Sequence, residues 1–128
     1  MSSGSVSKII LVLEIRGKSK MACELKRHLS PKTVGTIIRS LPLEGNAHLL
    51  GKSIAYFETP INSGIERPKS NFKKGDIAFL PVEGSICFFV VDSEPGKKMT
   101  PLGKITSNVD ALKEVKSGDV FSLYADNG

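Results

Sequence analysis

Six side chains of this sequence are the best candidates for binding a ligand, because they lie in or near two long polar segments, residues 62–74 and 92–100. They are Tyr56, Phe79, Phe89, Arg67, Lys97 and Lys98. The aromatic members fall in strand-like runs, and aromatic side chains beside long loops are typical of ligand-binding grooves. The basic members lie on the loops, where a short lysine pair attracts anions. We therefore expect a groove between the two segments that binds a peptide or a small anionic ligand. Core packing of the aromatics and solvated basic side chains are the alternative.

The histidines and cysteines do not form a pattern for metal binding or nucleophilic catalysis. His28 and His48 each stand next to a leucine, and neither Cys23 nor Cys87 belongs to a CxxC pair. No serine lies in a nucleophile elbow, and no glycine pattern matches a phosphate-binding loop. We therefore expect no catalytic residue, no metal and no cofactor. The two cysteines are flanked by strand residues and are expected to be reduced and buried; a disulfide between them is the alternative.

The composition is that of a basic, soluble chain. Its 128 residues carry 18 Lys and Arg against 13 Asp and Glu, a net charge of +5. This charge alone would allow nucleic-acid binding, but the lysines are scattered, no aromatic residues interleave with them, and tryptophan is absent. No apolar run approaches the length of about 20 residues needed to span a bilayer, and the apolar run at residues 9–13 is followed by Glu14 and Arg16. We expect a cytoplasmic protein that can act as a monomer and binds neither nucleic acid nor membrane.

The elements that must position the candidate side chains are mostly strands. Residues 21–27 alternate apolar and polar side chains, which is the period-two pattern of a half-buried strand. Gly45 and Asn46 predict a loop. The predicted strands lie at residues 9–15, 21–27, 53–59, 77–80, 86–91, 101–105 and 120–124.

Two short helices are predicted among these strands. Ser30 can cap a first turn that begins at Pro31, and apolar residues at helical spacing follow, so we expect a helix over residues 31–41. A second helix is predicted over residues 108–116, after a cap at Ser107 or Asn108.

Many strands with one early and one late helix favour a mainly β fold: a closed barrel of about eight antiparallel strands whose ends the helices cover. We expect a short tail at residues 1–7 and a single barrel domain over residues 8–126. Because helices would fill both ends, a ligand site should lie on the outer wall or under a loop.

The order of several short motifs is similar to that in the cyclophilins. The motifs are Cys23-Glu24-Leu25, Pro31-Lys32-Thr33, Cys87-Phe88-Phe89, Gly103-Lys104-Ile105 and Val109-x-x-Leu112. A further motif, Gly75-Asp76-x-x-Phe79-x-Pro81, more closely resembles the small archaeal and bacterial cyclophilin-like proteins of uncharacterised function. The resemblance covers about residues 8–125 and implies a cyclophilin-like β-barrel.

The resemblance also implies which residues a prolyl isomerase would need, and most of them are missing. Cyclophilins use an Arg on the strand pair after the first helix, an apolar pocket built with Phe, and a Gln, a Trp and a His. Residues 54–60 contain no Arg or Gln, Cys87 stands where the family has Gln, and residues 97–101 contain neither Trp nor His. Only Phe89 is retained. We therefore expect a non-catalytic binding module with negligible isomerase activity. A weak isomerase that uses Arg67 with Phe89 is one alternative, and a substrate-handling partner of an amide-hydrolysing enzyme is a second.

Overall fold

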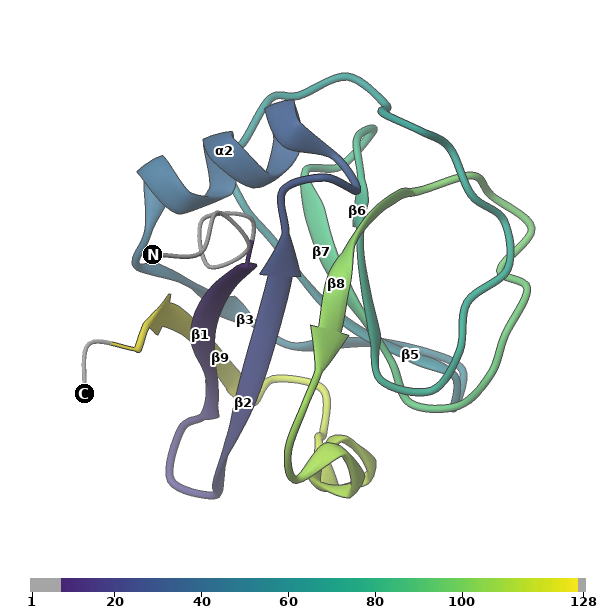
Figure 1. The fold of residues 1–128 in the computed structure, drawn as a ribbon. Coiled ribbons are helices and arrows are strands. Elements are labelled where there is room, and N and C mark those ends of the chain that lie inside the picture. The colour runs from purple at the N-terminus through teal and green to yellow at the C-terminus, as the bar shows by residue number, and fades with distance from the viewer. Residues whose placement is uncertain (1–7, 127–128) are drawn as a thin grey trace.

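The computed structural model describes residues 8–126 and shows a mainly β fold with two short helices (Figure 1). The strands are β1 (Lys8–Ile15), β2 (Ser19–Lys26), β3 (Leu43–Asn46), β4 (His48–Leu50), β5 (Ile54–Glu58), β6 (Asp76–Leu80), β7 (Ser85–Phe89), β8 (Thr100–Ile105) and β9 (Val120–Ala125). The helices are α2 (Pro31–Ser40) and the 3₁₀ helix η1 (Val109–Glu114). The tail predicted at residues 1–7 lies outside the described residues.

The strands form one curled antiparallel sheet that nearly closes on itself. Its nine strands follow the order β3-β9-β1-β2-β8-β6-β7-β5-β4. The two end strands, β3 and β4, are consecutive in the chain, so the sheet returns to its starting point at the segment that joins them. The predicted barrel of about eight antiparallel strands is therefore confirmed, with nine strands in place of eight.

The sequence-based prediction was wrong for two residues at this closure. Gly45 and Asn46 predicted a loop, but they belong to β3, which pairs with β9 from Leu43 opposite Leu123 to Asn46 opposite Val120. A Cβ atom on Gly45 would lie 3.2 Å from the Glu58 carbonyl oxygen. The glycine therefore permits a close approach of β3 to β5 and does not form a turn.

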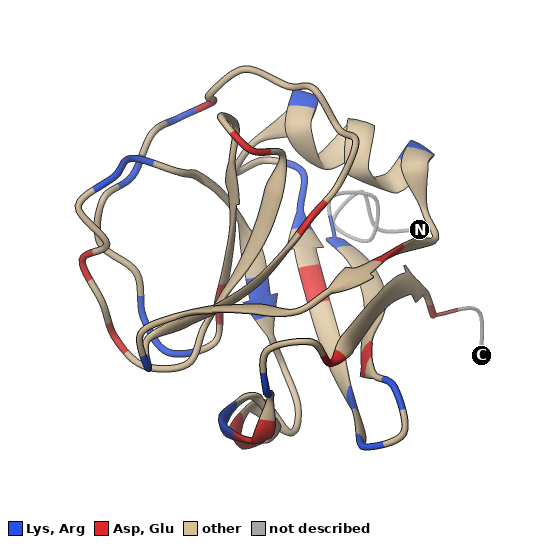
Figure 2. Ribbon diagram, turned by 180° about the vertical axis from the view of Figure 1, so that it is seen from behind, with Lys and Arg blue, Asp and Glu red and all other residues tan. Residues whose placement is uncertain are grey.

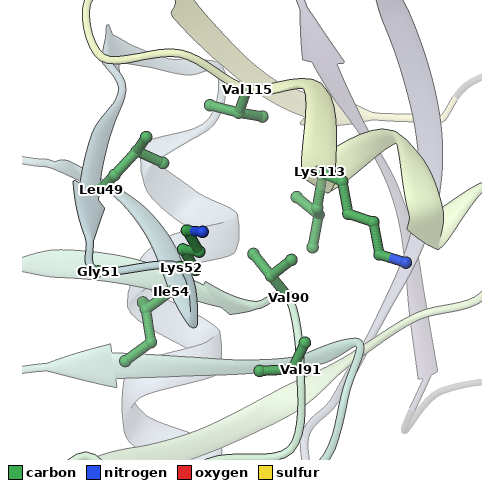
Figure 3. A pocket seen from close by; sticks show the side chains of 9 residues that line it. Leu49, Gly51, Lys52, Ile54, Val90, Val91, Lys113 and Val115 are labelled. Atoms are coloured by element: carbon green, nitrogen blue, oxygen red, sulfur yellow. The ribbon is translucent and has the colours of Figure 1, made fainter.

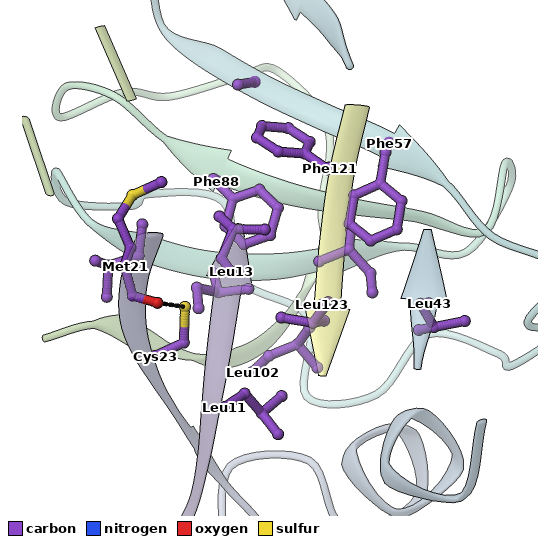
Figure 4. Packing of buried hydrophobic residues seen from close by; sticks show 14 of the residues in the cluster. Leu11, Leu13, Met21, Cys23, Leu43, Phe57, Phe88, Leu102, Phe121 and Leu123 are labelled. Atoms are coloured by element: carbon purple, nitrogen blue, oxygen red, sulfur yellow. Dashed lines mark hydrogen bonds between the residues drawn. The ribbon is translucent and has the colours of Figure 1, made fainter. Parts of the chain in front are cut away.

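Alternate residues of the strands fill the barrel interior. In the β1–β2 hairpin, for example, buried Leu13 faces buried Met21. At the centre, three phenylalanine rings from β5, β7 and β9 pack together with centroids 5.4 to 6.3 Å apart (Figure 4). These rings belong to Phe57, Phe88 and Phe121. The interior is thus a packed core and not a ligand cavity.

The helices lie at opposite ends of the barrel, as predicted (Figure 1). The helix predicted over residues 31–41 ends one residue earlier. The helix predicted over residues 108–116 is shorter than expected and is 3₁₀, and it buries Ala111 and Leu112. Asn108 precedes η1 in the left-handed region, with φ of 60°, and its side chain does not cap the helix.

The cap of α2 also differs from the prediction. Ser30 does not cap the helix with its side chain; its hydroxyl donates a 2.7 Å hydrogen bond to the carbonyl of Pro101 in β8. The carboxylate of Glu66, from the long loop before β6, takes this role. It accepts hydrogen bonds from the amides of Lys32 (3.2 Å) and Thr33 (2.9 Å) and from the Thr33 hydroxyl (3.0 Å). A residue distant in the sequence therefore caps α2 and attaches the loop to it.

Candidate functional site

A second apolar cluster lies on the outer face of the barrel, and we call it the wall cluster. Its buried members are Ile54, Phe72, Ala78, Leu80, Cys87, Phe89 and Met99, with Tyr56 packed against them. The two long polar loops contribute Phe72 and Met99, and they are joined by backbone hydrogen bonds. Phe72 pairs with Ser93, and Lys69 pairs with Met99. The loops therefore form one cover over this part of the sheet.

The wall cluster determines where the predicted aromatic residues lie. Phe89 belongs to it and is fully buried, and its ring stacks on that of Phe72 with 4.5 Å between centroids. Phe79 points to the opposite face of the sheet and belongs to the barrel interior, where it is also fully buried. The structure therefore does not bring Phe79 and Phe89 together with Tyr56 in one groove.

A small pocket opens beside the wall cluster, and we call it the wall pocket. Its volume is about 160 Å³. It is lined by Leu50, Ile54, Tyr56, Leu80, Glu83, Cys87, Pro95, Lys97 and Met99. Two of the predicted site residues, Tyr56 and Lys97, thus lie in the same pocket. A phenol, an ammonium and a carboxylate surround an apolar floor there.

Burial and nearby carboxylates keep the phenol and the thiol of the wall pocket protonated. Partial burial, followed by the charges of Glu83 and Glu58, raises the pKa of Tyr56, so its hydroxyl can donate a hydrogen bond. Burial raises the pKa of Cys87 to about 12, with Glu83 adding to the effect and Lys97 opposing it. The Cys87 thiol therefore does not act as a nucleophile at neutral pH.

Two further predicted residues, Arg67 and Lys98, are exposed and do not line the wall pocket. Arg67 directly follows Glu66, the residue that caps α2, and its backbone has φ of 45°. Lys98 is adjacent to Lys97 on the loop between β7 and β8, but only Lys97 contributes to the pocket. Of the three predicted basic residues, the structure therefore places one at a pocket with Tyr56.

A larger cleft, which the sequence did not indicate, lies at the η1 end of the barrel, and we call it the end cleft. Its volume is about 410 Å³, and Figure 3 shows its lining side chains. They are Leu49, Gly51, Lys52, Ile54, Val90, Val91, Leu112, Lys113 and Val115. They come from the β4–β5 hairpin, the segment after β7, and η1 with the residue after it. Because these segments are far apart in the sequence, no local pattern could have indicated the cleft.

The structure separates the two cysteines, which lie on opposite faces of the sheet. Cys23 faces the barrel interior and Cys87 faces the wall cluster, and both are free, buried thiols. Within residues 8–126, no group of three or more His, Cys, Asp or Glu could hold a metal ion. In the same residues, no helix has the length and apolar character needed to cross a membrane. Figure 2 shows basic and acidic residues interspersed on the loops, on β2 and on η1.

A curled antiparallel sheet with a filled interior and a helix at each end defines a small β-barrel of the cyclophilin type. The family model described as cyclophilin-like matches residues 8–123. The chain therefore belongs to the cyclophilin-like family, and the resemblance drawn from its motifs is confirmed.

Solved structures with a similar fold include two that cover most of this chain. The solution structure of the hypothetical protein AF2241 from Archaeoglobus fulgidus matches with a TM-score of 0.78 and 22% identity, covering 94% of this chain and 96% of that one. McbB, solved in complex with tryptophan, matches with a TM-score of 0.78 and 11% identity, covering 92% of this chain but 45% of its own. At these identities the likeness concerns the fold alone. Comparison with curated proteins gave no match.

Proposed function

We propose that this cyclophilin-like domain is a non-catalytic binding module and that the wall pocket is its site. The observation that carries the proposal is the position of Phe72. Its ring stacks on Phe89, the one pocket residue that the family resemblance retains, and it leaves that ring fully buried. A peptide proline would have to displace Phe72 to reach Phe89. Tyr56 and Lys97 instead line an open pocket beside the stacked rings.

The groups that could weaken a prolyl amide bond are also poorly placed for catalysis. Residues 54–60 contain no arginine. Arg67 is exposed near the N-terminal end of α2, while Phe89 is covered, so a joint action of the two in isomerisation would need the loop cover to open. This geometry supports binding over isomerisation.

The size and charge of the wall pocket indicate the class of ligand. A pocket of about 160 Å³ is below the usual range for drug-sized ligands, about 300–1,000 Å³, so we expect it to hold one group the size of an amino-acid side chain. Lys97 and Glu83 line the same pocket, so they place a positive and a negative charge beside that group. A peptide or free amino acid, which carries both charges, fits these partners better than a simple anion does.

Chemical-shift perturbation of amide resonances tests the proposal. The panel should contain proline peptides, small carboxylates, oligonucleotides and tryptophan, the last because McbB was solved with it. We expect saturable shifts at residues around Tyr56, Lys97 and Met99 with a peptide or amino acid. Tyr56→Phe and Lys97→Ala should each weaken this binding at least threefold, while the neighbouring Lys98→Ala should not. Shifts that appear only at scattered lysines and disappear with modest salt would overturn the proposal.

A protease-coupled assay on a tetrapeptide with an Xaa-Pro bond tests the absence of catalysis. We expect no rate above the uncatalysed background. A clear rate that is lost in Arg67→Ala would establish the weak isomerase instead.

A further inference from the structure

The end cleft is a second candidate site, which is larger than the wall pocket and shares only Ile54 with its lining. Its floor consists of Ile54, Val90, Leu112 and Val115, none of which is more than 8% exposed. Its rim includes Leu49 and Val91, which are 42% and 41% exposed. All the apolar lining is aliphatic, and no acidic side chain lines the cleft. Such a surface suits a flexible aliphatic chain better than a flat aromatic ring.

Two lysines provide all the charge of this lining. Lys52 lies on the turn between β4 and β5 and has no ion pair among the residues that the structure describes. Lys113 extends from η1 away from the cleft (Figure 3). Its Nζ lies 3.7 Å from Asp110, whose carboxylate is already held by Lys74 at 2.7 Å.

The Lys113–Asp110 contact can be exchanged for another anion at little cost. Both side chains are more than half exposed, and exposed ion pairs contribute little to stability. Because Asp110 keeps Lys74 as its partner, Lys113 is available to rotate toward the cleft. An anion placed at the rim near Lys52 would then meet two ammonium groups.

We propose that the end cleft binds an aliphatic carboxylate, with its apolar chain on the floor and its carboxylate between Lys52 and Lys113. The volume of about 410 Å³ lies within the usual range for small-molecule sites. The aliphatic chain of the bound carboxylate would cover Leu49 and Val91, the two exposed apolar residues of the rim. The same chemistry is offered by a free fatty acid and by the C-terminal residue of a polypeptide, so the experiment must distinguish these sources.

Titration with sodium octanoate, followed through amide chemical shifts, tests this site. We expect saturable shifts confined to residues 49–54, 90–91 and 112–115. Butyrate, which has too little chain, and 1-octanol, which has no charge, should each bind at least fivefold more weakly. Equal shifts with octanol, or shifts with octanoate that are spread over all surface lysines, would overturn the proposal.

Paired variants assign the charge to the proposed lysines. The double variant Lys52→Ala/Lys113→Ala should weaken octanoate binding at least fivefold, since it removes both cations from exposed positions that do not support the core. The matched control is Lys97→Ala/Lys98→Ala, which removes the same number of charges from the loop beside the wall pocket and should leave octanoate binding unchanged. Equal weakening by both variants would show general charge attraction and overturn the proposal.

Two further arms identify the source of the carboxylate. A pentapeptide ending in Val-Leu with a free C-terminal carboxylate should compete with octanoate, and its C-terminally amidated form should not. If the free-acid peptide binds more tightly than octanoate, the site is assigned to polypeptide C-termini. Concentration-dependent shifts of the cleft residues without any ligand would assign the face to a second copy of this chain and overturn the proposal. Tyr56→Phe should not affect octanoate binding, so this test and that of the wall pocket can fail independently.

Discussion

Replacing Glu66 should destabilise the protein through helix α2, although Glu66 lies far from that helix in the sequence. Its carboxylate accepts hydrogen bonds from two amides in the first turn and from the Thr33 hydroxyl, at 2.9 to 3.2 Å. Loss of a helix N-cap costs about 0.5–2 kcal/mol. Because Glu66 accepts three hydrogen bonds and also attaches the loop, we expect Glu66→Ala to cost about 1–2 kcal/mol at pH 7.

This cost can be converted into a shift of the melting temperature. An unfolding entropy of about 2.1 cal/mol/K per residue gives about 0.27 kcal/mol/K for a chain of this length, so 1 kcal/mol corresponds to about 4 °C. We therefore expect Glu66→Ala to melt about 4–8 °C below the wild type. Glu66→Gln keeps one acceptor oxygen but no charge. Its melting temperature should therefore lie between those of the wild type and Glu66→Ala.

The pH dependence follows from the pKa of Glu66. Partial burial alone would raise this pKa, but the hydrogen bonds from Thr33 and Lys32 outweigh it and lower the pKa below its ordinary value. A carboxylate with a lowered pKa in the folded state contributes stability that is fully present above its ordinary pKa of about 4.3. This contribution is lost as the pH falls through the lowered value. The difference in free energy of unfolding between the wild type and Glu66→Gln should therefore be constant from pH 6 to 8. It should shrink toward zero in strong acid.

Thermal melts followed by far-UV circular dichroism between pH 2.5 and 8 would measure both effects. Glu94→Ala is the matched control, because it removes an exposed glutamate from the other long loop. It should melt within about 2 °C of the wild type. A loss below 0.5 kcal/mol for Glu66→Ala at pH 7, or a difference from Glu66→Gln that persists unchanged in acid, would refute the capping role.

Two other perturbations follow directly from the packing. A Cβ on Gly103 would lie 1.9 Å from the Glu24 carbonyl oxygen, so Gly103→Ala must push β8 away from β2. We expect this variant to lower the free energy of unfolding, measured in urea, by at least about 2 kcal/mol. Gly64→Ala is the control and should leave that free energy unchanged, because the space around Gly64 is open. Burial raises the pKa of both Cys23 and Cys87 to about 12, so neither thiol should react with a disulfide reagent at pH 8 within minutes, and both should react once urea unfolds the chain. Rapid reaction of the native protein would contradict this burial.

Local patterns predicted most of the fold because strands such as β2 and β9 alternate in burial and because Pro31 marks the first turn of α2. They failed at Gly45, since a glycine that permits close approach looks the same in sequence as a glycine that forms a turn. They also could not identify Glu66 as the cap of α2, because capping here depends on a long loop returning to the helix.

The candidate site was predicted only in part for a similar reason. Tyr56 and Lys97 share a pocket, but Phe79 and Phe89 face opposite sides of the sheet. Their separation depends on the register of β6 against β7, in which Phe79 pairs with Ile86 and not with a residue of the outer face. Lys52 and Lys113 meet the same cleft only after the barrel has closed.

The two ends of the sheet also bear on how this protein behaves at high concentration. Exposed strand edges can pair with other chains and start aggregation. Here the edge strands β3 and β4 have four and three residues, and the chain passes directly from one to the other through buried Ala47. The Ala47 amide is bonded to the Asp119 carbonyl, and its own carbonyl accepts from Gly118. Either edge therefore exposes only a few consecutive backbone N–H and C=O groups to a strand from another molecule. This limits the pairing by which an intermolecular β-sheet could grow.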